Sequence, residues 1–246
     1  MHFHYDLIVT SCRRFDLLKQ TLKSFKEFAD IPPRTVIVIE DSELEDVKAV
    51  TLAIFPDAIV INNNPQIGQM ASIDKAYSFA SSDYIFHCED DWEFFRSHFI
   101  AESKKILDYL PEASMVSLRP RSELNPKVKH QPMQSIEGLD YFVADPKSHP
   151  EYFGYSFNPG LRRLEDFKKT PAINSFKSEA DVSLNFKQRG FYLAYLENAA
   201  VQHIGDERHV EDPTRPPKAK TFLQRMKRSI NKRMARLKRK FDSSSL

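Results

Sequence analysis

The chain has 246 residues, of which 41% are hydrophobic, a size and composition that suit one large domain or one domain with an appendage and exclude global disorder. No apolar run approaches the roughly 20 residues of a membrane-spanning helix, and the first residues lack the basic and then apolar pattern of a secretory signal. The only two cysteines, Cys12 and Cys88, provide no disulfide framework, so we expect a reduced, cytoplasmic setting.

The net charge of +2 hides a strong asymmetry between the two ends of the chain. Residues 218–246 contain 11 Lys or Arg and one Asp, whereas the preceding 217 residues contain 25 basic and 33 acidic side chains. The body is therefore mildly acidic and the tail strongly cationic. This division predicts an anionic partner for the tail alone.

Strands and helices are predicted to alternate through the first ninety residues. Short β-branched or apolar runs indicate strands, and apolar residues at helical spacing indicate the helices between them. The strands are expected at 5–10, 35–39, 58–61 and 84–86, and the helices at 15–28, 43–54 and 68–81. This alternation predicts an α/β fold with a largely parallel sheet and right-handed crossovers.

The remaining chain is less periodic. The predicted elements are a helix at 95–110, a strand at 115–118, a long loop at 119–150, a strand at 153–157, a helix at 178–188 with Ser178 at its N-cap, and a strand at 191–196. Residues 211–217 are a Pro-rich linker. We therefore expect one domain over 1–210 and a separate tail over 218–246.

Three consecutive acids, Glu89, Asp90 and Asp91, follow the fourth predicted strand. Open α/β sheets bind ligands at the carboxyl ends of their strands. Three adjacent carboxylates repel one another unless a cation or polar ligand is present, and hard oxygen ligands suit Mg²⁺ or Mn²⁺. A solvated acidic turn is the alternative, but the position after a buried strand favours a metal site with a phosphate attached.

Polar residues also follow the first two strands. Thr10, Ser11 and Arg13 come after the first, where an arginine could bind phosphate or simply form a surface charge pair. Asp41 follows the second strand, where a carboxylate could accept hydrogen bonds from a base or ribose, or could cap the next helix.

Two later segments add candidate acids and a histidine. Glu179 and Asp181 open a predicted helix, where acids compensate the helix dipole but could also include a general base. His203 follows an apolar run, so it is either a structural histidine or a metal ligand that faces the acid cluster.

The order of these motifs resembles that of the GT-A glycosyltransferases, particularly the family 2-like group, over roughly residues 5–210. Leu7 to Arg14 is similar to the opening strand and nucleotide loop of that group, and Val38 to Ser42 to its Val-Val-Asp-Asp-Gly-Ser element without the glycine. Glu89-Asp90-Asp91 takes the place of the Asp-X-Asp signature, with Glu for its first Asp, and the segment from Asn64 to Ala76 resembles the one that precedes it. Ser178 to Asp181, followed by Arg189-Gly190, is similar to the Glu-Asp-X-Asp…Gly motif.

The resemblance implies a Rossmann-like, mixed and mainly parallel sheet flanked by helices, and transfer of a sugar from a nucleotide-sugar with inversion. It implies Mn²⁺ or Mg²⁺ on Asp91 and His203, and a catalytic base at Glu179 or, alternatively, Asp181. The implied nucleotide-sugar contacts are Thr10, Ser11, Arg13, Asp41, Gln69, Lys75, Glu89 and Asp90. Residues 119–160 are expected to shape the site for a glycan or lipid-linked acceptor in surface polysaccharide synthesis.

The basic tail has the pattern of an amphipathic helix. Its apolar residues recur at intervals of three or four, at Phe222, Met226, Ile230, Met234, Leu237 and Phe241. A cationic amphipathic helix fits an anionic membrane surface, which predicts a peripheral protein on the inner face of the plasma membrane. Docking of the tail on the acidic body and binding of the tail to nucleic acid are the alternatives. We favour the membrane and expect no nucleic-acid partner.

Three other classes of protein remain open for the whole chain. A nucleotidyltransferase usually has a Gly-rich basic loop after its first strand, and residues 10–16 contain no glycine. A nucleic-acid-binding protein is expected to interleave aromatic and basic residues, but the body is acidic. A non-catalytic, transferase-like binding module would lack metal-dependent hydrolysis of nucleotide-sugars.

Overall fold

The computed structural model describes residues 3–205, 208, 210, 226 and 234. The chain divides into two compact units, 1–210 and 211–246. The predicted linker and most of the predicted tail helix lie outside the described residues. Met226 and Met234 are the exceptions, and both are helical and exposed. Among the described residues, no helix combines the length and the apolar character needed to cross a membrane.

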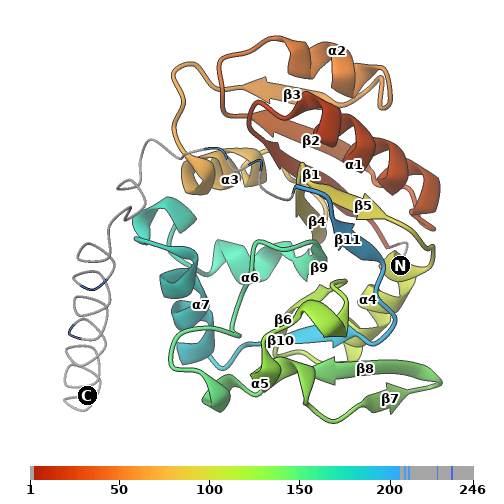
Figure 1. The fold of residues 1–246 in the computed structure, drawn as a ribbon, viewed down its shortest axis with the longest axis vertical. Coiled ribbons are helices and arrows are strands. Elements are labelled where there is room, and N and C mark those ends of the chain that lie inside the picture. Colours follow the sequence, from red (N-terminus) through yellow and green to blue (C-terminus); the bar gives the residue numbers. More distant parts are fainter. Residues whose placement is uncertain (1–2, 206–207, 209, 211–225, 227–233, 235–246) are drawn as a thin grey trace. The chain divides into compact units, whose positions relative to one another are not determined.

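A nine-stranded mixed sheet runs through the first unit (Figure 1). In spatial order the strands are β3 (Ile59–Asn62), β2 (Thr35–Glu40), β1 (Tyr5–Ser11), β4 (Tyr84–Glu89), β9 (Gly160–Arg163), β6 (Ala113–Ser117), β10 (Tyr192–Leu196), β8 (Leu139–Val143) and β7 (Gln134–Ile136). The first four strands in this order are parallel, β9 lies antiparallel between β4 and β6, β10 is parallel to β6, and the antiparallel hairpin β8–β7 forms the far edge. The predicted α/β fold with a mixed, mainly parallel sheet is confirmed.

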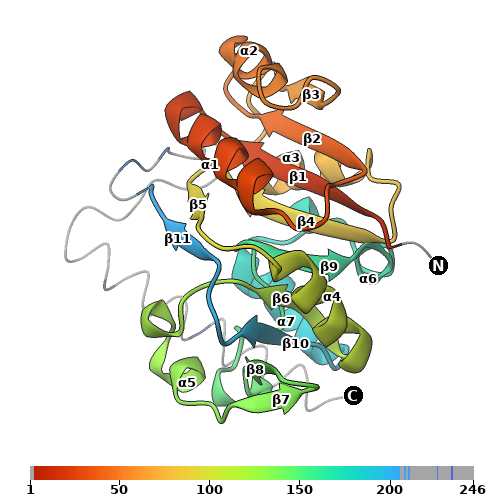
Figure 2. The same ribbon diagram turned by 90° about the vertical axis from the view of Figure 1, so that its right-hand side faces the viewer.

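Helices cover both faces of this sheet (Figure 2). Successive residues of β1 point to opposite faces, so Leu7 and Val9 join one core cluster and Ile8 joins another. The first cluster includes side chains of α1 (Phe15–Phe28) and α4 (Phe99–Tyr109), and the second includes those of α3 (Gln69–Tyr77), α6 (Leu164–Lys168) and α7 (Glu179–Gln188). A further helix, α2 (Asp46–Leu52), packs beside α1.

The register of the parallel strands brings their polar ends together. Thr10 of β1 is aligned with Glu89 of β4, Ser11 is aligned with Glu40 of β2, and Glu40 is aligned with Asn62 of β3. The polar residues that follow these strands therefore lie along one edge of the sheet, as the alternation of elements predicted.

The strand predicted at 153–157 is wrong. The segment is irregular, with Phe153 at a φ of 81°. Tyr155 and Phe157 join the core cluster that includes α6 and α7, whereas Phe153 joins a third cluster with side chains of β8 and β10. The strand begins at Gly160, where a Cβ would lie 2.3 Å from the carbonyl oxygen of Val116. Only glycine therefore lets β9 lie this close to β6.

The loop predicted over 119–150 is also wrong in part, because it contains several short elements. They are two 3₁₀ helices, η1 (Arg121–Glu123) and η2 (Pro146–Ser148), the helix α5 (Pro126–Lys129), and the hairpin β7–β8. A third 3₁₀ helix, η3 (Ile173–Ser175), precedes α7.

Two short strands were not predicted, and they form a second sheet. β5 (Trp92–Phe94) pairs in antiparallel fashion with β11 (Val201–His203), so that His203 lies opposite Trp92. This two-stranded ribbon brings residues 201–203 next to the strand that directly follows the acid cluster.

Candidate active site

The two-stranded ribbon places His203 against Asp91. The backbone N–H of Ile204 donates to the carbonyl oxygen of Asp91 at 2.9 Å, and His203 Nε2 lies 3.3 Å from Asp91 Oδ2. The His203 ring meets the Trp92 indole edge-on, with 5.0 Å between the ring centroids. The structure therefore brings Asp91 and His203 together, as the sequence predicted, although more than a hundred residues separate them in the chain.

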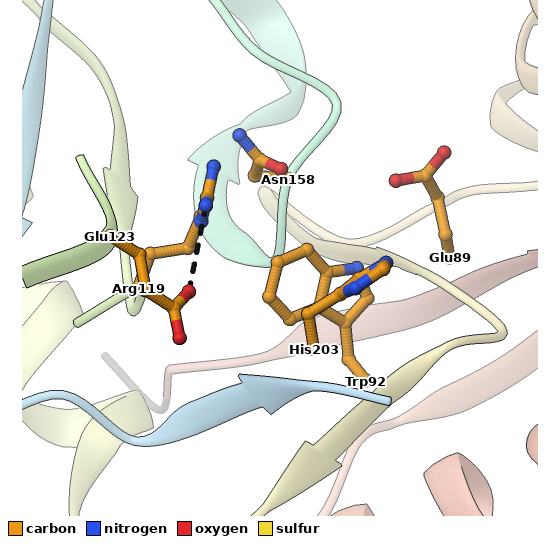
Figure 3. A pocket seen from close by; sticks show the side chains of 6 residues that line it. All are labelled: Glu89, Trp92, Arg119, Glu123, Asn158 and His203. Carbon is orange, nitrogen blue, oxygen red and sulfur yellow. Dashed lines mark ion pairs between the residues drawn. The ribbon is translucent and has the colours of Figure 1, made fainter. Parts of the chain in front are cut away.

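A cavity of about 490 Å³ opens beside His203 and Trp92 (Figure 3). The Arg119 guanidinium lies 5.6 Å from the centre of the Trp92 ring and pairs with Glu123 at 3.5 Å. The cavity is lined by Glu89, Trp92, Arg119, Glu123, Asn158 and His203. Residues 119–123 and Asn158 belong to the segment predicted to shape an acceptor site.

Arg14 neutralises part of the acid cluster. Its Nη1 donates to Asp91 Oδ2 at 2.7 Å, and its Nη2 donates to Asp90 Oδ1. The prediction named Arg13 as a ligand contact instead. Arg13 is exposed and has a φ of 61°, and its backbone N–H donates to Glu40 Oε1 at 2.8 Å. The turn at Arg13 thus directs the side chain of Arg14 to the acids.

Burial and, to a smaller extent, the remaining negative charge raise the pKa values of two acids. Burial, followed by the charges of Asp91, Glu179 and Asp90, raises the pKa of Glu89 to about 8. Burial raises the pKa of Asp90 to about 7, although Arg14 acts in the opposite direction. Further positive charge at this edge would stabilise the ionised form of both acids.

The loop after β1 closes over Asp90. Thr10 and Ser11 are both buried at the end of the strand, and the backbone N–H of Cys12 donates to Asp90 Oδ2 at 3.2 Å. The contact of these residues with a nucleotide-sugar stays a prediction, but the structure brings both of them to the acid cluster.

Asp41 is engaged by protein donors. Its carboxylate accepts the backbone N–H groups of Ile67 at 2.8 Å and Gly68 at 2.7 Å, and the Asn63 amide at 3.0 Å. It therefore orders the segment between β3 and α3. The aligned Glu40 is fully buried, and its Oε2 has no hydrogen-bond partner among the described residues. The contact of Asp41 with a nucleotide-sugar stays a prediction, and Glu40 is the member of this acidic pair that keeps an oxygen without a described partner.

The two other predicted residues of this region differ in position. Gln69 Nε2 donates to Glu89 Oε1 at 2.6 Å, so Gln69 belongs to the acid cluster. Lys75 is exposed, and its ammonium donates to Asn63 Oδ1 at 2.8 Å. Lys75 thus supports the Asp41-anchored segment from outside.

Glu179 lies at the N-terminus of α7, and its charge acts on Glu89 across the site. Glu179 Oε1 accepts the Ser156 hydroxyl and the backbone N–H of Phe157, both at 3.0 Å, whereas Oε2 makes no hydrogen bond with a described residue. A carboxylate held by one oxygen, with the other available, has the form of a general base.

Asp181 has a different environment, within the helix cap. The Ser178 hydroxyl donates to Asp181 Oδ2 at 2.8 Å and accepts the Asp181 backbone N–H at 3.4 Å, which confirms Ser178 as the N-cap. The geometry favours Glu179 over Asp181 as the acid that faces the cluster.

The donor set at Asp91 fits a divalent ion that takes further ligands from a substrate. Asp91 Oδ1 is buried and has no hydrogen-bond partner within the described part of the chain, and His203 supplies a nitrogen beside the other oxygen. No group of three or more His, Cys, Asp or Glu side chains arranged for a metal occurs within the described part of the chain. Mg²⁺ is commonly held by one or two protein carboxylates together with phosphates and water.

Gly205 is a residue of the site that sequence reasoning did not single out. A Cβ at this position would lie 2.6 Å from Asp91 Oδ2 and 2.9 Å from Asp91 Cβ. The backbone after β11 can therefore pass the acid only without a side chain. A glycine two positions after a candidate ligand histidine was the available signal.

The sequence and the fold place the chain in a known family. A model described as glycosyl transferase family 2 matches residues 6–170, so the chain belongs to this glycosyltransferase family. The comparison with curated proteins gave no match.

Three solved structures share the GT-A fold with this chain. The mannosyltransferase PcManGT from Pyrobaculum calidifontis, in complex with GDP-Man and Mn²⁺, is similar at a TM-score of 0.60 and 14% identity over 84% of this chain and 59% of its own. S. aureus TarS 1–349 has a TM-score of 0.57 and 13% identity, over 81% and 59% of the two chains. GalNAc-T7 with UDP, GalNAc and Mn²⁺ has a TM-score of 0.60 and 12% identity, over 87% and 45%. The chain spans less than two thirds of the length of each neighbour.

Substitution of Gly205 tests the close contact at Asp91. We expect Gly205→Ala to push the Asp91 carboxylate out of place and to weaken Mn²⁺ binding at least tenfold, because the added methyl group would overlap Oδ2. Quenching of the fluorescence of Trp92, the only tryptophan in the chain, measures the binding.

Gly138→Ala is the matched control. Gly138 has a φ of 79°, and an added Cβ there meets no atom within 4 Å. The control loses stability through backbone strain, and its Mn²⁺ affinity stays at the wild-type value. Equal Mn²⁺ affinity in Gly205→Ala and wild type would show that Asp91 does not hold the ion.

Proposed function

We propose that this protein is a metal-dependent, inverting glycosyltransferase that moves a sugar from a nucleotide-sugar to a glycan or lipid-linked acceptor. The observation that carries the proposal is the position of Asp91 and His203 at one end of the polar edge, with Glu179 acting on the same cluster from α7. Membership of glycosyl transferase family 2 supports it. So do neighbours solved with GDP-Man or UDP together with Mn²⁺.

The charge of the site suits a diphosphate leaving group. When Mn²⁺ or Mg²⁺ is bound at Asp91 and His203, it would neutralise the negative charge that develops on the diphosphate as the glycosidic bond breaks. Arg14 reaches the same carboxylates from the loop after β1, so it adds fixed positive charge at this edge. Thr10, Ser11 and Glu89 lie at the strand ends where the nucleotide-sugar would bind, and Gln69 reaches Glu89 from the start of α3.

The proton balance of the transfer step requires a base. The acceptor oxygen forms a bond to the anomeric carbon on the face opposite the diphosphate, the bond to the diphosphate oxygen breaks, and the hydroxyl proton passes to Glu179 Oε2. The two hydrogen bonds to Oε1 hold the carboxylate in place during this transfer. Arg119, Trp92 and Asn158 would border the acceptor in the cavity.

A nucleotidyltransferase is the alternative enzyme, and a non-catalytic nucleotide-sugar-binding module is the alternative binding protein. No described feature favours the nucleotidyltransferase, because the loop after β1 presents Arg14 to acids instead of a Gly-rich phosphate cradle. An assay of nucleotide-sugar hydrolysis or sugar transfer separates the two classes, because an enzyme shows metal-dependent turnover and a binding module shows none.

We further propose that residues 218–246 attach the enzyme to an anionic membrane surface, where a lipid-linked acceptor for surface polysaccharide would be located. The 11 basic residues and the helical spacing of the apolar ones support this assignment. Met226 and Met234 of the apolar face are 47% and 64% exposed. Co-sedimentation with phosphatidylserine vesicles tests it: the full chain should sediment and a chain ending at 217 should not, whereas equal binding would refute the attachment.

A thermal-shift screen of nucleotide-sugars with Mn²⁺ tests the proposed donor class. A ligand that binds only the folded state stabilises it by about 2.7 kcal/mol at 100 times its Kd, which corresponds to a rise in Tm of roughly 5 °C or more for a chain of this size. We expect one nucleotide-sugar to raise Tm in the presence of Mn²⁺ and not in the presence of EDTA. The absence of any such shift would contradict the proposed function.

Substitution of the two acids of α7 tests the base. Glu179→Gln keeps the hydrogen-bonding shape and removes the proton acceptor, so we expect transfer to fall by about 10²–10⁴-fold. Donor binding, measured by Trp92 fluorescence, should be unchanged. Asp181→Asn is the matched control and should cost stability through the cap. If Asp181→Asn alone abolishes transfer, the base is Asp181.

A further inference from the structure

Arg162 of β9 is a fully buried cation without an acidic partner. It is among the largest side chains with essentially no exposed surface, and no described carboxylate lies within ion-pair distance of it. Removal of a guanidinium from water is costly unless its N–H groups are satisfied. Its Nε has no hydrogen-bond partner among the described residues, so the groups that accept from Nη1 and Nη2 indicate what Arg162 holds in place.

Most of those groups belong to one short segment, residues 155–158, which overlaps the irregular stretch 153–157 and precedes β9. Arg162 Nη1 donates to the Tyr155 hydroxyl at 2.6 Å and to the Ser156 carbonyl oxygen at 3.3 Å, and Nη2 donates to the Asn158 carbonyl oxygen at 2.9 Å. A second phenol, Tyr77, lies 3.4 Å from Nη1. One rigid, planar side chain thus fixes the path of residues 155–158 from below.

The upper side of this segment is the support of Glu179. The Ser156 hydroxyl and the Phe157 N–H are the two donors to Glu179 Oε1. The Asn158 amide donates to Ser156 Oγ at 2.7 Å, and its side chain lines the cavity. A continuous chain of hydrogen bonds therefore runs from the buried guanidinium to the proposed base.

We propose that Arg162 is a positioning residue for the transfer step: through residues 155–158 it sets the orientation of the Glu179 carboxylate toward the acceptor. The inference rests on the proposed function, because it concerns the base of that reaction. Arg162 contacts the cavity lining only at the backbone carbonyl of Asn158, and it makes no hydrogen bond to the acid cluster at the ends of β1 and β4, so we expect its effect on donor binding to be small.

The neighbouring Arg163 provides a matched control. It also donates to backbone carbonyls, at 3.0 Å to Leu110 and 3.0 Å to Ala113, but these lie at the end of α4 and the start of β6. Arg163 lies on the same strand as Arg162, is partly buried and is also bonded to carbonyl oxygens. Arg163→Met therefore removes a comparable arginine and leaves the support of Glu179 intact.

The test compares four variants with the donor selected by the thermal-shift screen. We expect Arg162→Met to lower kcat by about 10²-fold, the scale associated with a displacement of about 1 Å, with the donor KM and the Trp92 binding signal within about threefold of wild type. Arg162→Lys, which restores one donor, should recover part of kcat. Arg163→Met should lose stability and keep kcat. Tyr155→Phe removes the 2.6 Å bond without a buried charge change and should lower kcat severalfold, so it carries the test if Arg162→Met does not fold.

A double variant separates this inference from the proposed function. If Arg162 acts only through Glu179, Arg162→Met has no further effect in a Glu179→Gln background, because residues that act as one unit are not additive. Additive losses, or equal losses of kcat in Arg162→Met and Arg163→Met, would overturn the inference. Wild-type transfer by Glu179→Gln alone would instead overturn the proposed base.

Discussion

The repulsion among Glu89, Asp90 and Asp91 is the constraint around which this domain is arranged. The three acids lie at and just after the end of the buried strand β4, at the edge of the sheet where the other parallel strands also end. Burial and their mutual charge raise the pKa of Glu89 to about 8 and the pKa of Asp90 to about 7. A cluster with these properties needs cations, and the surrounding elements either supply them or leave space for them.

Two arginines, one in the loop after β1 and one buried in β9, support this site in different ways. Arg14 reaches Asp90 and Asp91 directly, because the positive φ at Arg13 turns the loop after β1. Arg162 is fully buried in β9, and it contacts carbonyl and phenol oxygens instead of acids. The first arginine balances charge where a diphosphate would leave, and the second holds the support of the acid that would accept the proton. The site therefore depends on a surface loop for its electrostatics and on a buried strand for its geometry.

Much of this arrangement was predictable from local pattern. The alternation of strands and helices up to Glu89 predicted the parallel half of the sheet, and the acids at strand ends predicted one polar edge. Ser178 was correctly identified as an N-cap, because a serine followed by acids in the first turn is a strong local signal. These features depend on neighbours in the sequence.

The features that were missed depend on contacts between distant residues. Nothing near Trp92 indicates that it pairs with residue 203, because β5 is only three residues long and its partner lies at the end of the described domain. The aromatic alternation at 153–157 resembled a strand, but the guanidinium of Arg162 and the helix α7 hold the segment in an irregular form. Likewise, Arg13 and Arg14 are equivalent in sequence, and only the backbone turn decides which of them reaches the acids.

Fluorescence titration of Trp92 tests the central claim most directly, since this single tryptophan lines the cavity beside His203. Mn²⁺ and a nucleoside diphosphate should bind with positive coupling, each raising the affinity of the wild-type chain for the other by about tenfold or more, because the ion completes its coordination on the phosphates. Asp91→Asn should abolish the coupling while the far-UV circular dichroism is retained. Independent binding of the two ligands to the wild-type chain, or unchanged coupling in Asp91→Asn, would contradict the account.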